Sequence, residues 1–421
     1  MASDLRLPRQ IWLLGGVSFF ADISGEMIYP LLPLFIVSVL GASATDMGWI
    51  EGVATAMVAF ASAWAGTRSD RLRRRVRWVR IGYALPVVGK VVLTAASAWS
   101  TVLLGRTVDR IGKGFRTSPR DALIADASSP ATRGRAFGLH RSLDTAGALI
   151  GVLISAALLW WLTGTPSATA DASRDAQPYR IIFAIAAAIG LVALALTWLV
   201  RDVAAPESVA SKAESVPATL SLPGRYWRSL ATLLVFALAN SSDAFLLLRA
   251  HQVGLSAWAV VAAYAAYNVI YAALSYPAGA LSDRIGRWWL IAIGWGIFAV
   301  AYALFAIADA VVIWPAFAIY GVYMALTEGV AKALIADCAP ISHRGRALGI
   351  LNLGMGIASI LSSVAAGVLW DRVSHSAPFW LGTGGAIAAL LLLVPRRSDF
   401  DRFGPPIHRR SHRYAPSRYR Q

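Results

Sequence analysis

Charged residues and cysteine are both scarce in this chain of 421 residues. Only 15% of the residues are Asp, Glu, Lys or Arg, whereas 57% are hydrophobic and the mean hydropathy is +0.58. Soluble domains are about 45–50% hydrophobic, so this chain lacks the polar surface that it would need in water. Its one cysteine, Cys338, excludes an intrachain disulfide. The scarcity of charge predicts an integral membrane protein with many transmembrane segments.

Sequence motifs of enzymes are missing as well. Gly112 and Lys113 resemble the end of a phosphate-binding loop, which requires a glycine five residues earlier and Ser or Thr after the lysine. Thr107 and Gly114 stand at those positions, and no nucleophile-elbow, zinc-protease or paired-cysteine spacing occurs. We therefore predict that the chain is not an enzyme and needs neither a cofactor nor a metal ion.

Apolar stretches long enough to cross a bilayer, about 20 residues each, recur along the whole chain. They predict an all-α membrane protein with twelve transmembrane helices, the first of them interrupted by Pro30 and Pro33. The expected helices lie close to residues 11–40, 46–65, 78–97, 99–127, 137–162, 179–200, 226–249, 257–277, 288–307, 312–337, 347–369 and 378–394.

Arginine is concentrated in alternate loops between these segments. Seven arginines lie within residues 68–80, and others cluster around residues 133–135, 284–287 and 344–346, whereas the intervening loops hold almost no Lys or Arg. This distribution follows the positive-inside rule. It predicts a multi-pass protein of the inner membrane with both termini in the cytoplasm. The net charge of +16 is then a matter of orientation, and we expect no nucleic-acid partner.

A polar stretch with three prolines, residues 201–224, follows the sixth expected helix. We expect it to be a cytoplasmic linker between an N-terminal six-helix bundle, residues 11–200, and a C-terminal one, residues 225–394. Residues 1–10 would form a cytoplasmic N-terminus, and residues 395–421 a basic cytoplasmic tail.

Several short motifs occur once in each half, in the same order and 211 to 213 residues apart. The repeated residues include Gly66, Asp70, Arg71 and Asp126 in the first half and Gly279, Asp283, Arg284 and Asp337 in the second. Such duplication predicts two pseudo-symmetric bundles with a binding site between them. A carboxylate at a helix end can accept from a helix N-terminus or an arginine, so we expect these residues to form a gate. The alternative is that they only set the orientation.

Residues 103–126, LLGRTVDRIGKGFRTSPRDALIAD, place charge inside an expected membrane helix. Arg106, Asp109, Arg110 and Lys113 recur at helical spacing and share one face. Such a stripe lines water or a protein interior rather than lipid. Because it holds more positive charge than Asp109 can neutralise, we expect an anionic group of a solute near Arg106 or Arg110.

Carboxylates also occur within the first expected helix, where Asp22 and Glu26 share one face. At this depth they persist when paired or when they titrate. Pairing with the cationic stripe, proton coupling and substrate contact all stay open. In the C-terminal half, we assign Asn240, Asp243 and Glu328 to the same pathway, although Glu328 and Lys332 can also satisfy each other.

These motifs resemble the major facilitator superfamily, over essentially the whole chain. The family pattern G-x-x-x-D-R-x-G-R-R corresponds to Gly66, Asp70, Arg71, Arg74 and Arg75, with Arg73 in place of the second glycine, and to Gly279, Asp283, Arg284, Gly286 and Arg287. The R-x-x-Q-G-x-G element of the fourth helix corresponds to Arg106, Asp109, Arg110 and Gly112. The antiporter signature G-x-x-x-G-P is represented by Gly147 and Gly151, with Val152 at the proline position.

The resemblance implies a bacterial secondary transporter that works by alternating access. We expect proton-coupled export of a small solute, with proton-coupled uptake of an anionic metabolite as the alternative and a membrane receptor or scaffold as a more distant one. The expected partners are a small-molecule substrate, protons and the lipid bilayer, and we expect a monomer.

Overall fold

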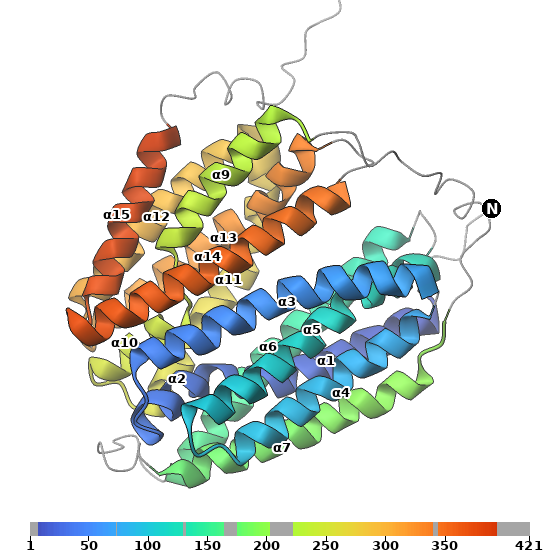
Figure 1. Cartoon of the computed structure of the whole chain (residues 1–421), viewed down its shortest axis with the longest axis horizontal. Coiled ribbons are helices and arrows are strands. Elements are labelled where there is room, and N and C mark those ends of the chain that lie inside the picture. The colour runs from blue at the N-terminus through green and yellow to red at the C-terminus, as the bar shows by residue number, and fades with distance from the viewer. Residues whose placement is uncertain are drawn as a thin grey trace, which may run out of the picture.

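The computed structural model describes residues 7–72, 74–128, 132–163, 175–202, 222–339 and 344–393, which form helices and short connections with no β-strand (Figure 1). Most of the expected linker, residues 203–221, and the whole expected tail lie outside the described residues. The same holds for residues 1–6 and for the side chains of Asp70, Arg71 and Asp283.

The N-terminal half consists of six long helices and a short irregular segment. The long helices are α1 (Arg9–Glu26), α3 (Ala44–Leu72), α4 (Arg75–Thr94), α5 (Trp99–Ala127), α6 (Arg133–Thr163) and α7 (Ala176–Leu196). The short segments are η1 (Tyr29–Leu31), α2 (Leu32–Leu34) and η2 (Phe35–Val39) before α3, and η4 (Thr197–Leu199) after α7.

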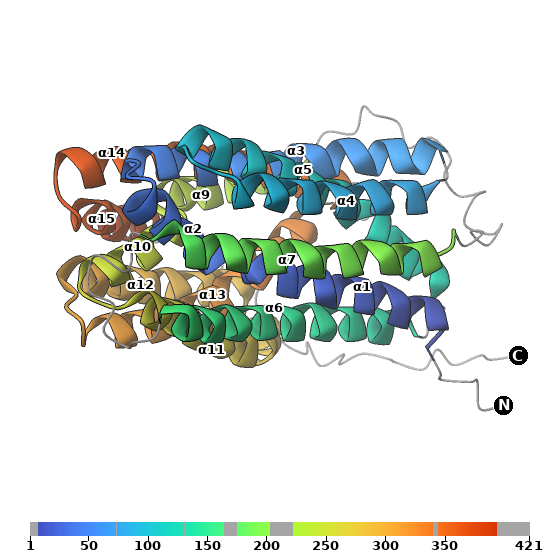
Figure 2. The same ribbon diagram turned by 90° about the horizontal axis from the view of Figure 1, so that it is seen from below.

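The C-terminal half repeats this arrangement. Its helices are α9 (Gly224–Ala239), α10 (Ala244–Gln252), α11 (Ala257–Ile285), α12 (Arg287–Ile307), α13 (Ile313–Cys338), α14 (Arg344–Arg372) and α15 (Ala377–Leu393). The long helices of both halves run nearly parallel to one another in Figure 2. The prediction of an all-α membrane protein with two six-helix bundles is confirmed.

Eight helical segments in the described chain are both long and apolar enough to cross a membrane. α3 and α5, with 29 residues each, and α4, with 20, are long but more polar. α15 is apolar but has only 17 residues. Much of the polar character of α5 comes from charged side chains that line a pocket inside the bundle, and Lys90 of α4 lies in the same lining.

Two of the expected helices are broken. In the first, α1 ends at Glu26 and is followed by the irregular segment that holds Pro30 and Pro33, as expected from residues that lack a backbone N–H. In the seventh, which we expected to be continuous, residues 240–243 separate α9 from α10. The backbone polar groups that the break frees are satisfied by α14, since Ser362 Oγ donates to Asn240 O at 3.1 Å.

The two halves approach each other most closely along α3 and α14 (Figure 1). A Cβ atom on Gly48 would lie 2.3 Å from the carbonyl oxygen of Ser363, and one on Gly367 would lie 2.5 Å from that of Ala44. Only glycine permits this contact. It involves the beginning of α3 and the end of α14, and in Figure 1 the two helices diverge from there.

Candidate functional site

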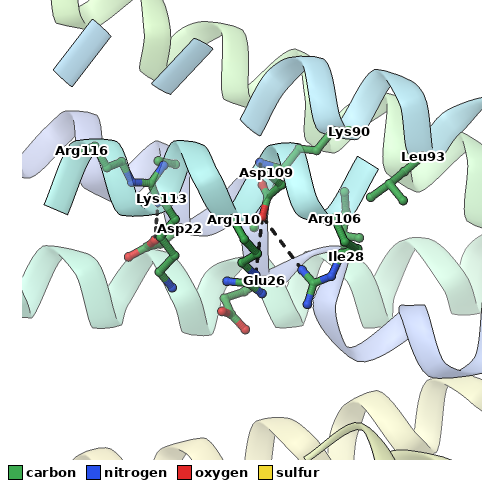
Figure 3. Close-up of a pocket in the computed structure, with 12 residues that line it drawn as sticks. Asp22, Glu26, Ile28, Lys90, Leu93, Arg106, Asp109, Arg110, Lys113 and Arg116 are labelled. Carbon is green, nitrogen blue, oxygen red and sulfur yellow. Dashed lines mark ion pairs between the residues drawn. The ribbon is translucent and has the colours of Figure 1, made fainter. Parts of the chain in front are cut away.

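A polar pocket lies inside the N-terminal half, where α1, α4 and α5 meet (Figure 3). Five of its lining side chains are cationic and three are carboxylates. The lining residues are Ala21, Asp22, Gly25, Glu26, Ile28, Lys90, Leu93, Arg106, Asp109, Arg110, Lys113 and Arg116. The stripe predicted on residues 103–126 is therefore the face that α5 turns toward this pocket.

The positive charge of Arg106 is neutralised by Glu51, a residue of α3 that does not itself line the pocket. Its Nη2 atom lies 2.7 Å from Oε1 of Glu51 on α3, and only 4% and 6% of these two side chains are exposed. The guanidinium also lies 5.6 Å from the ring of Tyr29. A short, buried, charge-assisted contact of this kind holds Arg106 in place. Its charge is thus largely committed within the protein.

Asp109 is shared among three cations at longer distances. Its carboxylate lies 3.8 Å from Lys90 Nζ, 3.7 Å from Arg110 Nε and 4.0 Å from Arg106 Nη1. Lys113 has no described carboxylate within 4.0 Å. Cationic groups of Arg110 and Lys113 are therefore available at the pocket (Figure 3).

The predicted carboxylates of α1 have different partners. Asp22 Oδ1 lies 3.8 Å from Nη2 of Arg116, whose guanidinium carbon lies 4.5 Å from the ring of Tyr83. Glu26 Oε2 accepts a hydrogen bond of 3.2 Å from the hydroxyl of Tyr264 on α11. Glu26 therefore links the pocket to the C-terminal half.

The structure brings six of the predicted pathway residues into one pocket but does not add the three from the C-terminal half to its lining. Asp243 accepts hydrogen bonds from the hydroxyls of Tyr267 at 3.0 Å and Tyr320 at 2.6 Å. Asn240 donates to the Tyr323 hydroxyl at 3.1 Å. Tyrosine hydroxyls thus satisfy these polar groups in the described conformation.

Glu328 is likewise occupied by neighbours. It forms an ion pair of 3.1 Å with Lys332, one turn along α13, and accepts a hydrogen bond from the Tyr271 hydroxyl. The alternative that Glu328 and Lys332 satisfy each other therefore describes this structure.

The repeated carboxylates at the helix ends form equivalent ion pairs in the two halves. Asp126, at the end of α5, pairs with Arg75, the first residue of α4. Asp337, near the end of α13, pairs with Arg287, the first residue of α12. Both pairs lie within one half rather than between halves.

The remaining predicted gate residues are only partly described. A Cβ atom on Gly66 would lie 3.3 Å from the side chain of Ser118, whereas one on Gly279 would meet nothing within 4 Å. Arg284 is exposed in the last turn of α11. Gly286 precedes α12 with φ of 97°, a conformation that favours glycine. The corresponding position in the first half is Arg73, which lies outside the described residues.

Sequence reasoning missed three charged residues of the site. Glu51 and Lys90 each stand alone in an apolar stretch, which is itself a signal for an intramembrane function. Arg116 follows Lys113 by three residues and continues the stripe of α5. All three side chains are less than one-tenth exposed.

Comparisons with known proteins agree with this architecture. The family model described as Major Facilitator Superfamily matches residues 14–264 and 230–415. An uncharacterised MFS-type transporter of Methanocaldococcus jannaschii is 32% identical over 401 residues, which cover 93% of this chain and 96% of that protein. The multidrug resistance protein MdtH of Photorhabdus laumondii is 29% identical over 133 residues, about a third of each chain (32% and 33%).

The fold is similar to that of solved transporters. A crystal structure of a variant of the nucleoside transporter NupG superposes with a TM-score of 0.76, covering 92% of this chain and 99% of that one. At 12% identity, this likeness concerns the fold alone.

Proposed function

This chain belongs to the major facilitator superfamily, and on that premise we propose that it carries a small organic anion across the membrane together with protons. The family makes it a multi-pass membrane transporter of a small molecule and not an enzyme. The nature of the cargo, the direction and the coupling are the proposal.

The excess of cations at the pocket supports an anionic cargo. With Arg106 bound to Glu51, and Asp109 placed among three cations, Arg110 and Lys113 have the least compensation. A buried charge without a partner costs several kcal/mol, and a cargo carboxylate or phosphate would supply one. We assign Arg110 and Lys113 to cargo binding and Arg106 to holding the arrangement of α3 and α5.

The carboxylates of α1 support proton coupling. An inside-negative membrane potential opposes the entry of an anion by about 2.3 kcal/mol per charge for each 100 mV. Export of an anion is not opposed by this potential. Accumulation of an anion inside the cell is opposed by it, and protons that enter with the anion would offset its charge. Asp22 and Glu26 line the same pocket as the cations, which supports a role for them in carrying protons with the cargo. This favours uptake over export.

The orientation that we propose follows the arginine-rich loops. Those near residues 68–80, 133–135, 284–287 and 344–346 would face the cytoplasm. Both termini would then be cytoplasmic and the membrane the inner one. We also propose that the bundles divide at residues 201–224 and that the protein works as a monomer.

Export of drug-like cations is the second candidate. The partial match to a multidrug resistance protein favours it, and the same two carboxylates would then bind the cargo. The two candidates differ in the sign of the cargo charge.

The deciding experiment is a thermal-shift screen of the purified protein. Lactate, succinate, citrate and inorganic phosphate serve as anions, and tetraphenylphosphonium and ethidium as cations. We expect an anion to raise the unfolding temperature and Lys113→Gln to abolish that rise. Lys332→Gln is the matched control, since Lys332 is 57% exposed and outside the pocket. Stabilisation by the cations alone would refute the anion proposal and favour export.

A further inference from the structure

Two carboxyl groups from different helices meet beside the pocket. α1 and α6 pack against each other, and the carboxyl groups of Asp22 on α1 and Asp144 on α6 lie close enough to interact. Asp144 Oδ1 is buried and has no hydrogen-bond partner among the described residues. Two carboxylates offer only acceptors, so this contact forms a hydrogen bond only when one of them holds a proton.

The charged groups around the pair do not replace that proton. From α5, Arg116 lies 3.8 Å from Asp22 Oδ1, on the pocket side. From α6, Arg141 Nη1 lies 3.5 Å from Asp144 Oδ2, and its side chain is 69% exposed. Neither arginine approaches Asp144 Oδ1 closely enough to donate to it.

Other titratable groups extend the polar cluster away from the pocket. His140, one turn before Asp144, places Nε2 2.8 Å from Ser18 Oγ, which also lies 3.2 Å from Arg120 Nη1 and 3.1 Å from the Tyr83 hydroxyl. The remaining groups that face the pair or its arginines are Lys113 of α5, Tyr271 of α11 and Glu328 of α13. Asp144 thus connects the pocket carboxylate to a buried polar cluster in the bundle.

We propose that Asp22 and Asp144 share one proton and together form the proton-carrying group of the transporter. The inference rests on the proton coupling proposed above and assigns to Asp144 a role that the pocket lining alone does not give it. Asp22 is the member beside the cargo, and Asp144 is the member through which its proton is exchanged.

The shared proton would link protonation to cargo binding through Arg116 and Lys113. While the proton is held, Asp22 is bound to Asp144 and leaves these cations to the anion. When the proton departs to water, two negative charges remain side by side. Asp144 then keeps Arg141, and Asp22 turns its full charge toward Arg116 and Lys113, where it competes with the cargo. Loss of the proton therefore favours release of the anion.

Infrared difference spectroscopy of the purified protein, without cargo, tests the shared proton directly. A protonated carboxyl group has a C=O band distinct from that of a carboxylate. We expect Asp22→Asn and Asp144→Asn each to remove the same single band at neutral pH, and the double variant to remove no second one. An asparagine at 144 can donate to Asp22 from its amide, so Asp22 then needs no proton. Asp121→Asn, which removes a 45%-exposed carboxylate of α5, should keep the band.

Proton movement in proteoliposomes tests the transport role, with the same four anions and a pH-sensitive dye inside. We expect Asp144→Asn to lose anion-dependent proton movement while anion exchange persists. If Asp144→Asn keeps both the infrared band and wild-type proton movement, the inference is overturned. Asp144→Glu keeps a carboxyl group at this position and should therefore keep the infrared band. If Asp144→Glu retains the band and Asp144→Asn loses it, the loss is due to the missing carboxyl group and not to misfolding.

The two proposals fail in different ways. If no anion moves protons through the wild type, the proposed coupling is wrong, and with it the carrier role of the pair. The band then still decides whether the proton is shared. If the wild type couples anions to protons but Asp22→Asn and Asp144→Asn do not remove the same infrared band, the shared proton is refuted and the proposed coupling stands.

Discussion

The carboxylate of Asp371, near the end of α14, caps the beginning of α3 in the other half of the molecule. It accepts hydrogen bonds from Thr45 Oγ1 at 2.6 Å, from Thr45 N at 2.9 Å and from Ala44 N at 3.1 Å. Helix N-termini leave backbone N–H groups unsatisfied and attract negative charge. Within its own half, α3 is capped by Ser43, whose Oγ accepts from Asp46 N at 3.0 Å. Asp371 adds acceptors from the opposite bundle for the two N–H groups that Ser43 leaves free. The contact therefore exists only while these two helix ends are together.

Asp371→Ala should make it easier for the halves to separate at this end. A lost helix cap costs about 0.5–2 kcal/mol, so the separated conformation should gain in population by about 2- to 30-fold. With spin labels at Ala42 and Ser374 in a Cys338→Ser background, a larger fraction of Asp371→Ala molecules should show a long distance between the two labels. An unchanged distance distribution would show that the glycine contacts of α3 and α14 hold the end closed by themselves.

Asp309→Ala provides the matched control, because Asp309 caps a helix within its own half. It accepts from the backbone N–H groups of Val311 and Val312 at 2.8 and 2.7 Å. These two hydrogen bonds hold the pKa of Asp309 below its usual value. The contribution of this cap is therefore present at neutral pH and is lost as the pH falls through the lowered pKa. Its removal should leave the Ala42–Ser374 distances unchanged.

Much of the fold could be predicted from the sequence, because each helix is a long apolar stretch and the halves repeat. The polar face of α5 was predictable for the same reason, since helical spacing alone puts Arg106, Asp109, Arg110 and Lys113 together. The partner of Arg106 was not, because periodicity says which face is polar but not which neighbouring helix lies opposite. That Glu51 supplies the counter-charge depends on the packing of α3 against α5.

The break between α9 and α10 shows a second limit. The residues around it are apolar enough to suggest one continuous helix, and only Asn240-Ser-Ser-Asp243 hints otherwise. These short polar side chains compete with helical hydrogen bonds, but they break the helix here because α14 offers alternative partners. Ser363 Oγ accepts from the backbone N–H of Ser242 at 3.2 Å. Such partners lie about 120 residues away in the sequence.

Removal of the Arg106 charge should affect folding before it affects binding. Arg106→Gln leaves Glu51 buried without its partner, and breaking a buried pair costs about 3–5 kcal/mol. In detergent, the unfolding temperature of Arg106→Gln should be much lower than that of the wild type. The double variant Glu51→Gln with Arg106→Gln should recover much of the difference. Lys113→Gln should not lower stability, because it separates no ion pair. Equal stability of Arg106→Gln and the wild type would place the functional charge of Arg106 in the pocket instead.

The ion pairs Arg75–Asp126 and Arg287–Asp337 should matter for transport more than for stability. Their side chains are 20–42% exposed, and ion pairs of this exposure contribute about 1 kcal/mol or less. Each pair joins the start of one helix to the end of the next, directly after a repeated motif, so it fixes the loop that must move when the halves rock. We expect Asp126→Asn and Asp337→Asn to reduce transport in proteoliposomes while unfolding temperatures stay near the wild-type value.

Exchange of the charges separates gating from orientation. The double variant Arg287→Asp with Asp337→Arg keeps the ion pair and the net charge, whereas Asp337→Arg alone places two cations together. Transport should recover in the double variant relative to the single one, since the contact and not the position of each charge matters to the gate. If both variants insert normally and transport at the wild-type rate, the pair has no part in the transport cycle. If Arg287→Asp alone inverts labelling of Ala42→Cys from outside intact cells, that arginine sets the orientation instead.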